Sequence, residues 1–140
     1  MSRVFWDTNL FIYLLEGHGA LGKRVVELRR AMLARGDQLL TSALTLGEVL
    51  VKPIEKGDQQ LAEKYEQAIE AASLVIPFET KAARIYAGLR ADRSLRAPDA
   101  IQLSCAAAAG VELFITNDTR LQGKQVAGIQ FIISLERAPL

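Results

Sequence analysis

The sequence has very few of the residues that mark secreted, disulfide-stabilised or membrane proteins. Its 140 residues include a single cysteine, Cys105. One cysteine cannot form a disulfide within the chain, which indicates a reducing compartment. No segment approaches the roughly 18 consecutive apolar residues of a membrane-spanning helix. We therefore expect a cytoplasmic protein that does not associate with membranes.

The chain also lacks an excess of either charge. Lysine and arginine number 17 and the acids 16, which leaves a net charge of +1. This excludes the overall basic field of an obligate nucleic-acid-binding protein, so any contact with a polyanion must come from a local patch. The length and the 50% hydrophobic content predict one globular domain over residues 1–140.

Short apolar runs alternate with longer segments of helical periodicity. Five runs are too short for helices and rich in β-branched or aromatic residues, and we expect each to be a strand buried on both faces. They cover residues 4–6, 38–40, 74–76, 113–115 and 130–133. Apolar residues three and four apart predict helices within residues 21–32, 61–72 and 82–89. The alternation predicts an α/β fold, a three-layer α/β/α sandwich with a central five-stranded, mostly parallel sheet.

Four acidic residues fall where such a sheet would bring them to one edge. Asp7 follows the first predicted strand and Asp118 follows the fourth. Asp99 opens the predicted helix "APDAIQLSCAAAAG", and Glu48 lies in the helix that follows the second strand. Ligands of these folds bind outside the carboxyl ends of the strands. The four acids are therefore candidates for a shared site.

Each acid taken alone also has a purely structural interpretation. Asp7 and Asp118 are candidate helix N-caps, and Asp99 is favoured near the positive end of a helix dipole. Thr45 and Glu48 have the spacing of a capping box. Caps occur at any helix, whereas these four acids all fall toward one edge of the predicted sheet. A functional cluster accounts for that coincidence and separate caps do not.

Gathering carboxylates has an electrostatic cost. Two of them about 4 Å apart repel by roughly 4 kcal/mol at an effective dielectric constant of ~20. A site that accepts this repulsion either retains a proton or holds a cation, and oxygen ligands suit Mg²⁺ or Mn²⁺. Such a site supports hydrolysis of a phosphodiester, because the metal activates water and neutralises charge on the phosphoryl oxygens.

Four sequence segments surround these acids. They are "DTNLFIYLLEG", "TSALTLGEVL", "RAPDAIQLSCAAAAG" and "LFITNDTRL". In order and spacing, over nearly the whole chain, they resemble the PIN-domain family, and in particular its VapC-type ribonuclease toxins. The resemblance implies the acidic metal cluster of a Mg²⁺-dependent endoribonuclease, formed by Asp7, Glu48, Asp99 and Asp118. It further implies that Thr116 orients the site and that Asn9 helps to hold the first acid.

The same resemblance implies a sheet order and a set of partners. The sheet order would be 3-2-1-4-5. The substrate would be RNA, and the protein would be the toxin of a toxin–antitoxin pair, inhibited by a cognate antitoxin that covers the active groove. Family members typically form homodimers or hetero-oligomers with the antitoxin. Tyr13, Leu14 and Leu15 exceed the apolar surface that one buried helix face needs, and they are candidates for such an interface.

A basic stretch precedes the third acid. Arg90, Arg93 and Arg96 are candidate contacts to RNA phosphates. The alternative is a solvated helix end, where cations are favoured by the negative end of the dipole.

Two other functions compete with a nuclease. A catalytically silent PIN-like module that binds RNA or protein would usually lack one or more acids, and this chain has all four. A phospho-accepting receiver would place an aspartate at the end of the third strand, where this chain has "VIPFET". Retention of the four acids favours the nuclease.

Overall fold

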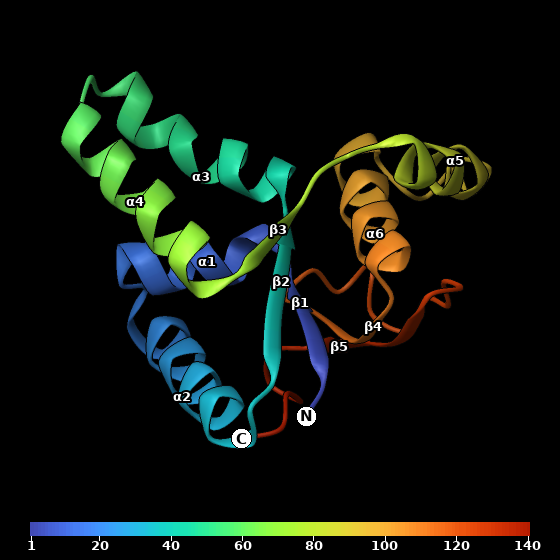
Figure 1. Cartoon of the computed structure of the whole chain (residues 1–140), viewed down its shortest axis with the longest axis horizontal. Coiled ribbons are helices and arrows are strands. Elements are labelled where there is room, and N and C mark those ends of the chain that lie inside the picture. The colour runs from blue at the N-terminus through green and yellow to red at the C-terminus, as the bar shows by residue number, and fades with distance from the viewer.

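The computed structural model describes all 140 residues, which form a single five-stranded sheet with helices on both faces (Figure 1). The strands are β1 (Arg3–Trp6), β2 (Gln38–Ser42), β3 (Leu74–Ile76), β4 (Val111–Thr116) and β5 (Ile129–Ser134). Their order is β3-β2-β1-β4-β5, and all four neighbouring pairs are parallel. The predicted fold class and sheet order are confirmed.

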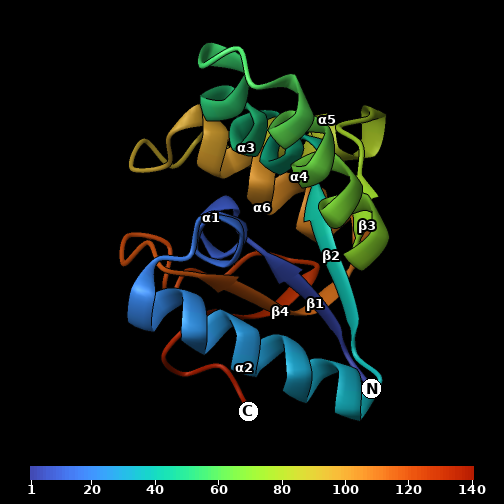
Figure 2. The same ribbon diagram turned by 90° about the vertical axis from the view of Figure 1, so that its left-hand side faces the viewer.

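Six helices connect the strands. They are α1 (Thr8–Glu16), α2 (Gly19–Arg35), α3 (Ala43–Glu55), α4 (Gln59–Ala72), α5 (Thr80–Leu89) and α6 (Ala97–Ala109). Figures 1 and 2 show α1 and α2 on one side of the strands, and α5 and α6 on the other. Helices α3 and α4 form a hairpin that extends beyond the carboxyl end of β2. No helix is both long enough and apolar enough to cross a membrane.

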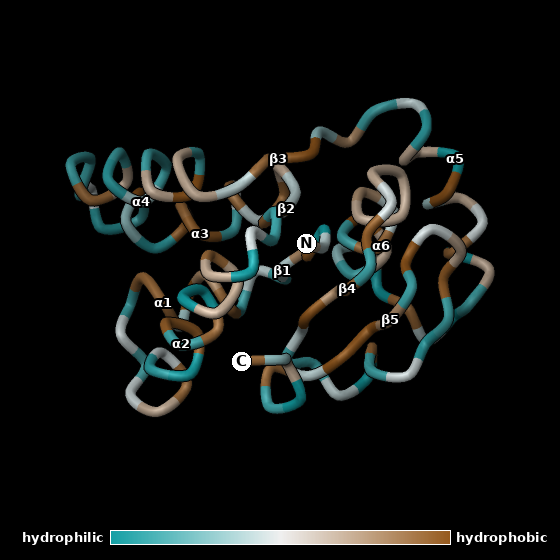
Figure 3. Tube along the Cα trace, turned by 60° about the horizontal axis from the view of Figure 1, so that its bottom comes forward, coloured by the Kyte–Doolittle hydropathy of each residue, from teal (hydrophilic) through white to brown (hydrophobic).

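Side chains of the central strands alternate between two apolar cores. In β1, Val4 and Trp6 pack toward α1 and α2, whereas Phe5 packs toward α5 and α6. Phe5 stacks on Phe114 of β4, with ring centroids 5.0 Å apart. Hydrophobic residues are concentrated along the strands in Figure 3, whereas the outer turns of α4 are hydrophilic. The alternation explains why strands of consecutive apolar residues are stable at the centre of a parallel sheet.

The edge strands differ from the sequence prediction. Burial on both faces was expected for all five strands, and it is wrong for β3 and β5, where Leu74 is 46% exposed and Phe131 is 58% exposed. These strands lie at the margins of the sheet, where the helical layers do not cover both faces.

The register between β1 and β4 places the residues that follow these strands side by side. Trp6 pairs with Ile115, and the backbone N–H of Asp7 donates to the carbonyl oxygen of Ile115 at 3.0 Å. The residues that follow the two strands are therefore neighbours in space.

Candidate active site

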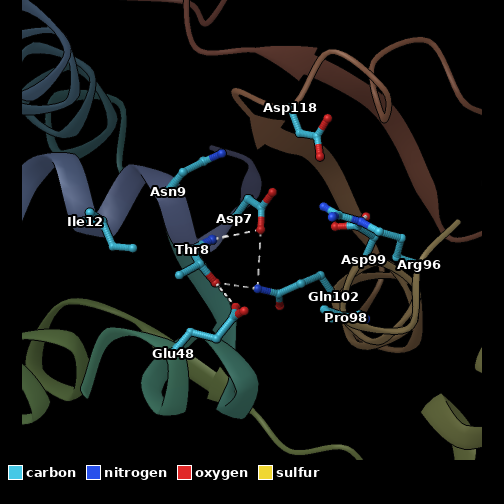
Figure 4. Close-up of a pocket in the computed structure, with 10 residues that line it drawn as sticks. All are labelled: Asp7, Thr8, Asn9, Ile12, Glu48, Arg96, Pro98, Asp99, Gln102 and Asp118. Carbon is cyan, nitrogen blue, oxygen red and sulfur yellow. Dashed lines mark hydrogen bonds and ion pairs between the residues drawn. The ribbon is translucent and has the colours of Figure 1, made fainter. Parts of the chain in front are cut away.

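A polar pocket opens at the carboxyl ends of β1 and β4, with a volume of about 410 Å³ (Figure 4). It is lined by Asp7, Thr8, Asn9, Ile12, Glu48, Arg96, Pro98, Asp99, Gln102 and Asp118. All four acids singled out in the sequence line this pocket, although they come from four separate segments. The structure therefore brings the predicted cluster together.

Asp7 is the most deeply buried of the four acids. It is the N-cap of α1, and its Oδ1 accepts a hydrogen bond from the backbone N–H of Thr8 at 2.8 Å. Its Oδ2 accepts a hydrogen bond from the hydroxyl of Thr116 at 2.7 Å. Burial raises the pKa of Asp7, the two hydrogen bonds oppose that rise, and the charges of Asp99 and Glu48 add to it. The capping interpretation is thus correct, and the same carboxylate also faces the pocket.

Thr116 links the acids that follow the two strands. Its side chain is fully buried at the end of β4. While its hydroxyl donates to Asp7, it also accepts a hydrogen bond from the backbone N–H of Asp118 at 3.0 Å. Asn9 lines the same pocket but makes no hydrogen bond to Asp7, and its Oδ1 is buried without a partner. The hydrogen bonds that orient Asp7 come from Thr8 and Thr116 instead.

Glu48 belongs to the pocket rather than to a capping box. The N-cap of α3 is Ser42, whose side chain accepts from the backbone N–H of Thr45 at 3.3 Å. The helix therefore begins before the proposed cap, and the capping-box interpretation of Thr45 and Glu48 is wrong. Oε1 of Glu48 accepts a hydrogen bond from the hydroxyl of Thr8 at 2.6 Å. Thr8 thus joins the first strand's end to α3.

Gln102 connects these elements at the wall of the pocket, and the sequence did not lead us to predict it. This buried residue lies one turn after Asp99 in α6. Its side-chain amide donates to the hydroxyls of Thr8 at 2.9 Å and Thr45 at 2.8 Å, and it lies 3.4 Å from Oδ1 of Asp7. A polar amide three residues after an acid, in a helix otherwise rich in alanine, was the available signal.

Asp99 and Asp118 are paired with arginines. Asp99 lies in the first turn of α6, and its Oδ2 is 3.4 Å from Nε of Arg96 and 3.7 Å from Nη2 of Arg120. Asp118 accepts from Nε of Arg120 at 3.0 Å, and a second oxygen contacts Nη2 of the same guanidinium. These hydrogen bonds hold the pKa of Asp118 below its usual range. Arg120 was not foreseen from the sequence.

Asp118 does not begin a helix. Its Oδ1 accepts from the backbone N–H of Arg120 at 2.9 Å, within a turn that follows β4. The interpretation of Asp118 as a helix N-cap is therefore wrong, and its carboxylate stabilises a turn instead.

The three predicted RNA-contacting arginines separate in space. Arg96 lines the pocket. Arg90 instead lies over the ring of Tyr86, 5.8 Å from its centroid, and donates to the hydroxyl of that tyrosine at 2.9 Å. Arg93 is exposed and forms no ion pair. Of these three arginines, only Arg96 lies among the acids.

The apolar candidates for a partner surface are half-buried. Leu14 and Leu15 line a small apolar cavity between α1, α2 and α4, and Tyr13 accepts a hydrogen bond from the amide of Asn117 at 3.1 Å. All three residues pack against the apolar core on that face of the sheet. Part of the apolar surface that was predicted to bind a partner is therefore buried against the protein's own core.

The donor set of the pocket suits a hard divalent cation. No three acidic side chains lie close enough together to share one ion. Mg²⁺ takes only one or two carboxylates and keeps several waters, so the pocket does not need a tighter cluster. Neither Asp7 nor Glu48 has a basic partner, although burial disfavours the charge of Asp7. A cation between the acids would compensate that charge.

Comparison with known proteins agrees with this fold. The model of the PIN domain matches residues 4–126. No curated protein matches the sequence. A chain of VapBC2 from Rickettsia felis, solved with a DNA fragment from its promoter, is similar with a TM-score of 0.75 and 15% identity, over 94% of this chain and 98% of that one.

Two further solved structures have the same fold. A chain of the DNA-bound VapBC from Salmonella typhimurium has a TM-score of 0.69 and 18% identity, over 96% of this chain and 99% of that one. A chain of a toxin–antitoxin complex from Klebsiella pneumoniae has a TM-score of 0.64 and 23% identity, over 90% and 94% of the two chains. With residues 4–126 matched by the family model and the sheet order expected for it, this chain belongs to the PIN domain family.

Proposed function

We propose that this protein is a VapC-type toxin, a Mg²⁺-dependent endoribonuclease that hydrolyses RNA phosphodiester bonds. One observation carries the proposal: four acids from separate segments line a single polar pocket at the carboxyl edge of the sheet. The buried carboxylate of Asp7 lies in that pocket without a basic partner. Mn²⁺ has similar ligand preferences and is expected to replace Mg²⁺.

Asp7 and Asp99 are the residues we expect to bind the metal directly, with Glu48 and Asp118 acting through water. Mg²⁺ bound there lowers the pKa of a coordinated water and neutralises charge on the phosphoryl oxygens. The four carboxylates lie at the N-cap of α1, within α3 and α6, and in the turn after β4. Their arrangement therefore depends on the packing of these elements and not on one flexible loop.

Hydrogen bonds hold the first acid in place before any substrate arrives. Thr116 and the N–H of Thr8 each donate to a different oxygen of Asp7, which fixes the plane of the carboxylate. Gln102 donates to Thr8, and Thr8 in turn donates to Glu48. Preorganised polar groups of this kind reduce the reorganisation needed during reaction.

Arg96 lies on the rim of the pocket and is the residue we expect to contact an RNA phosphate. A guanidinium offers two parallel donors to phosphate oxygens. Arg90 and Arg93 lie away from the pocket lining, and contact between them and more distant phosphates stays a prediction. RNA binding through these arginines would be sensitive to salt.

A cognate antitoxin is the proposed protein partner. The support is the shared fold with chains from toxin–antitoxin complexes of Rickettsia felis, Salmonella typhimurium and Klebsiella pneumoniae. We further propose that the chain forms a homodimer or a hetero-oligomer with that antitoxin, as the resemblance to VapC-type toxins implies.

The deciding experiment incubates the purified chain with defined RNAs in Mg²⁺, Mn²⁺ or EDTA. Cleavage with either metal and none in EDTA is expected. Asp99→Asn should abolish cleavage, because it removes a carboxylate ligand. Asp92→Asn is the matched control, since Asp92 lies outside the pocket, where it pairs with Lys124 at 2.9 Å, and this variant should cleave normally.

The alternative function is a catalytically silent PIN-like module that binds RNA or protein. That alternative predicts RNA binding without cleavage in any metal, and no effect of Asp99→Asn on the length of the RNA. Undiminished cleavage by purified Asp99→Asn would contradict the proposed assignment of the acids.

A further inference from the structure

Arg120 lies between two acids of the pocket. Its Nε is 3.0 Å from Oδ1 of Asp118, and its Nη2 contacts the other oxygen of the same carboxylate. The same Nη2 is 3.7 Å from Oδ2 of Asp99 in α6. Figure 4 shows the carboxylates of Asp118 and Asp99 approaching the pocket from different elements. One guanidinium therefore neutralises acids that the chain brings together from distant segments.

The turn after β4 holds Arg120 in this position. The backbone N–H of Arg120 donates to Oδ1 of Asp118 at 2.9 Å, so backbone and side chain of one residue bind the same carboxylate. The planar fork of a guanidinium matches a carboxylate with two parallel hydrogen bonds, which an ammonium group cannot do. Arg96 also pairs with Asp99, but it contacts only that one acid.

We propose that Arg120 is a built-in counterion that competes with a divalent metal for Asp118 and Asp99. This inference rests on the proposed metal-dependent function. Metal binding is then an exchange, in which the guanidinium leaves the carboxylates as the ion arrives. Arg120 stabilises the acidic pocket while no metal is bound, and it sets how tightly the pocket binds metal.

The exposure of Arg120 makes this exchange feasible. Its side chain is 48% exposed, and the residues on either side of it lie in a turn rather than in a helix or strand. Ion pairs at such exposed positions are weak, because water and salt screen them. Removing two such pairs, and with them one positive charge, is expected to tighten metal binding by roughly three- to tenfold.

The test measures Mn²⁺ and Mg²⁺ affinity by isothermal titration calorimetry on the full chain, with no RNA. Arg120→Ala should bind Mn²⁺ roughly three- to tenfold more tightly than wild type. Arg120→Lys should fall between the two, because lysine keeps the charge and loses the fork. Arg93→Ala is the matched control, since it removes an exposed positive charge that contacts none of the acids, and its affinity should equal that of wild type.

Thermal melting separates a counterion from a purely structural residue. In EDTA, Arg120→Ala should melt below wild type, because Asp118 loses its ion pair and Asp99 keeps only Arg96 as a partner. In saturating Mn²⁺ the difference should disappear or reverse. A variant that melts lower by the same amount in both conditions, or an unchanged or weaker Mn²⁺ affinity in Arg120→Ala, would overturn this inference alone. A wild-type chain that binds neither ion would overturn the metal-dependent function as well.

Discussion

Replacing Thr116 with valine removes one hydroxyl from the acidic pocket and changes the shape of the side chain very little. That hydroxyl donates to Oδ2 of Asp7 at 2.7 Å and accepts from the N–H of Asp118 at 3.0 Å. A hydrogen bond to a charged group contributes about 1.5–3 kcal/mol, and one to a neutral group about 0.5–1.5 kcal/mol. In EDTA at about pH 7, we expect Thr116→Val to lower the free energy of unfolding by roughly 2–4.5 kcal/mol.

The loss should depend on pH in a defined direction. Burial raises the pKa of Asp7, and the Thr116 hydrogen bond opposes that rise, so the valine variant has a still higher pKa at Asp7. When the pKa of an acid is higher in the folded state than in the unfolded state, the protein loses stability as the pH rises through these two pKa values. Because the folded-state pKa of Asp7 is raised, acid favours the protonated carboxyl, and the lost bond is then increasingly a neutral one. We expect the loss to shrink toward about 1–3 kcal/mol at about pH 4.

Urea unfolding with EDTA at the two pH values measures both quantities. Thr116→Ser is the matched control, because it keeps the hydroxyl and removes only a buried methyl group. Its loss should be about 0.5–1.5 kcal/mol and equal at both pH values. If serine and valine variants lost the same free energy, or if the valine loss did not shrink in acid, the hydrogen bond to Asp7 would not stabilise the carboxylate as argued.

Three other substitutions test the first acid, its polar neighbours and the packing of the fold. In EDTA at about pH 7, Asp7→Asn should unfold at a higher urea concentration than wild type, because an amide caps the helix without a buried charge. The gain in stability should be smaller at about pH 4. A loss of stability at neutral pH would contradict this reasoning. Gln102→Leu should lower the free energy of unfolding by about 2–4 kcal/mol, since two buried threonine hydroxyls lose a donor, and a neutral result would refute its linking role. Gly128→Ala should lower the free energy of unfolding by about 3 kcal/mol or more, because φ at this position is 97° and a Cβ would lie 2.6 Å from the carbonyl oxygen of Ala107. An unchanged melting temperature would show that the backbone moves to accommodate the methyl group.

Local patterns in the sequence were sufficient to predict the strands and helices and to place the acids at one edge of the sheet. Apolar runs of three or four residues became strands because their side chains fill cores on both faces, as Phe5 and Trp6 do. Parallel strands align their carboxyl ends, so Asp7 and Asp118 had to be neighbours once β1 and β4 were paired. The same local patterns were misleading at Glu48, where a cap-like spacing occurs inside a helix that has already begun at Ser42.

The interactions that control the acids could not be read from local patterns. Arg120 reaches Asp99 only because α6 packs beside the turn after β4, and Gln102 reaches Thr8 across 94 residues of chain. These contacts depend on the relative placement of elements, which is decided by packing of the whole core. The sequence by itself determined that the acids gather at one edge of a parallel sheet. Only the tertiary structure decided which of them are buried, which are held by threonine and glutamine, and which are neutralised by arginine, because each of these depends on distances between residues far apart in the chain.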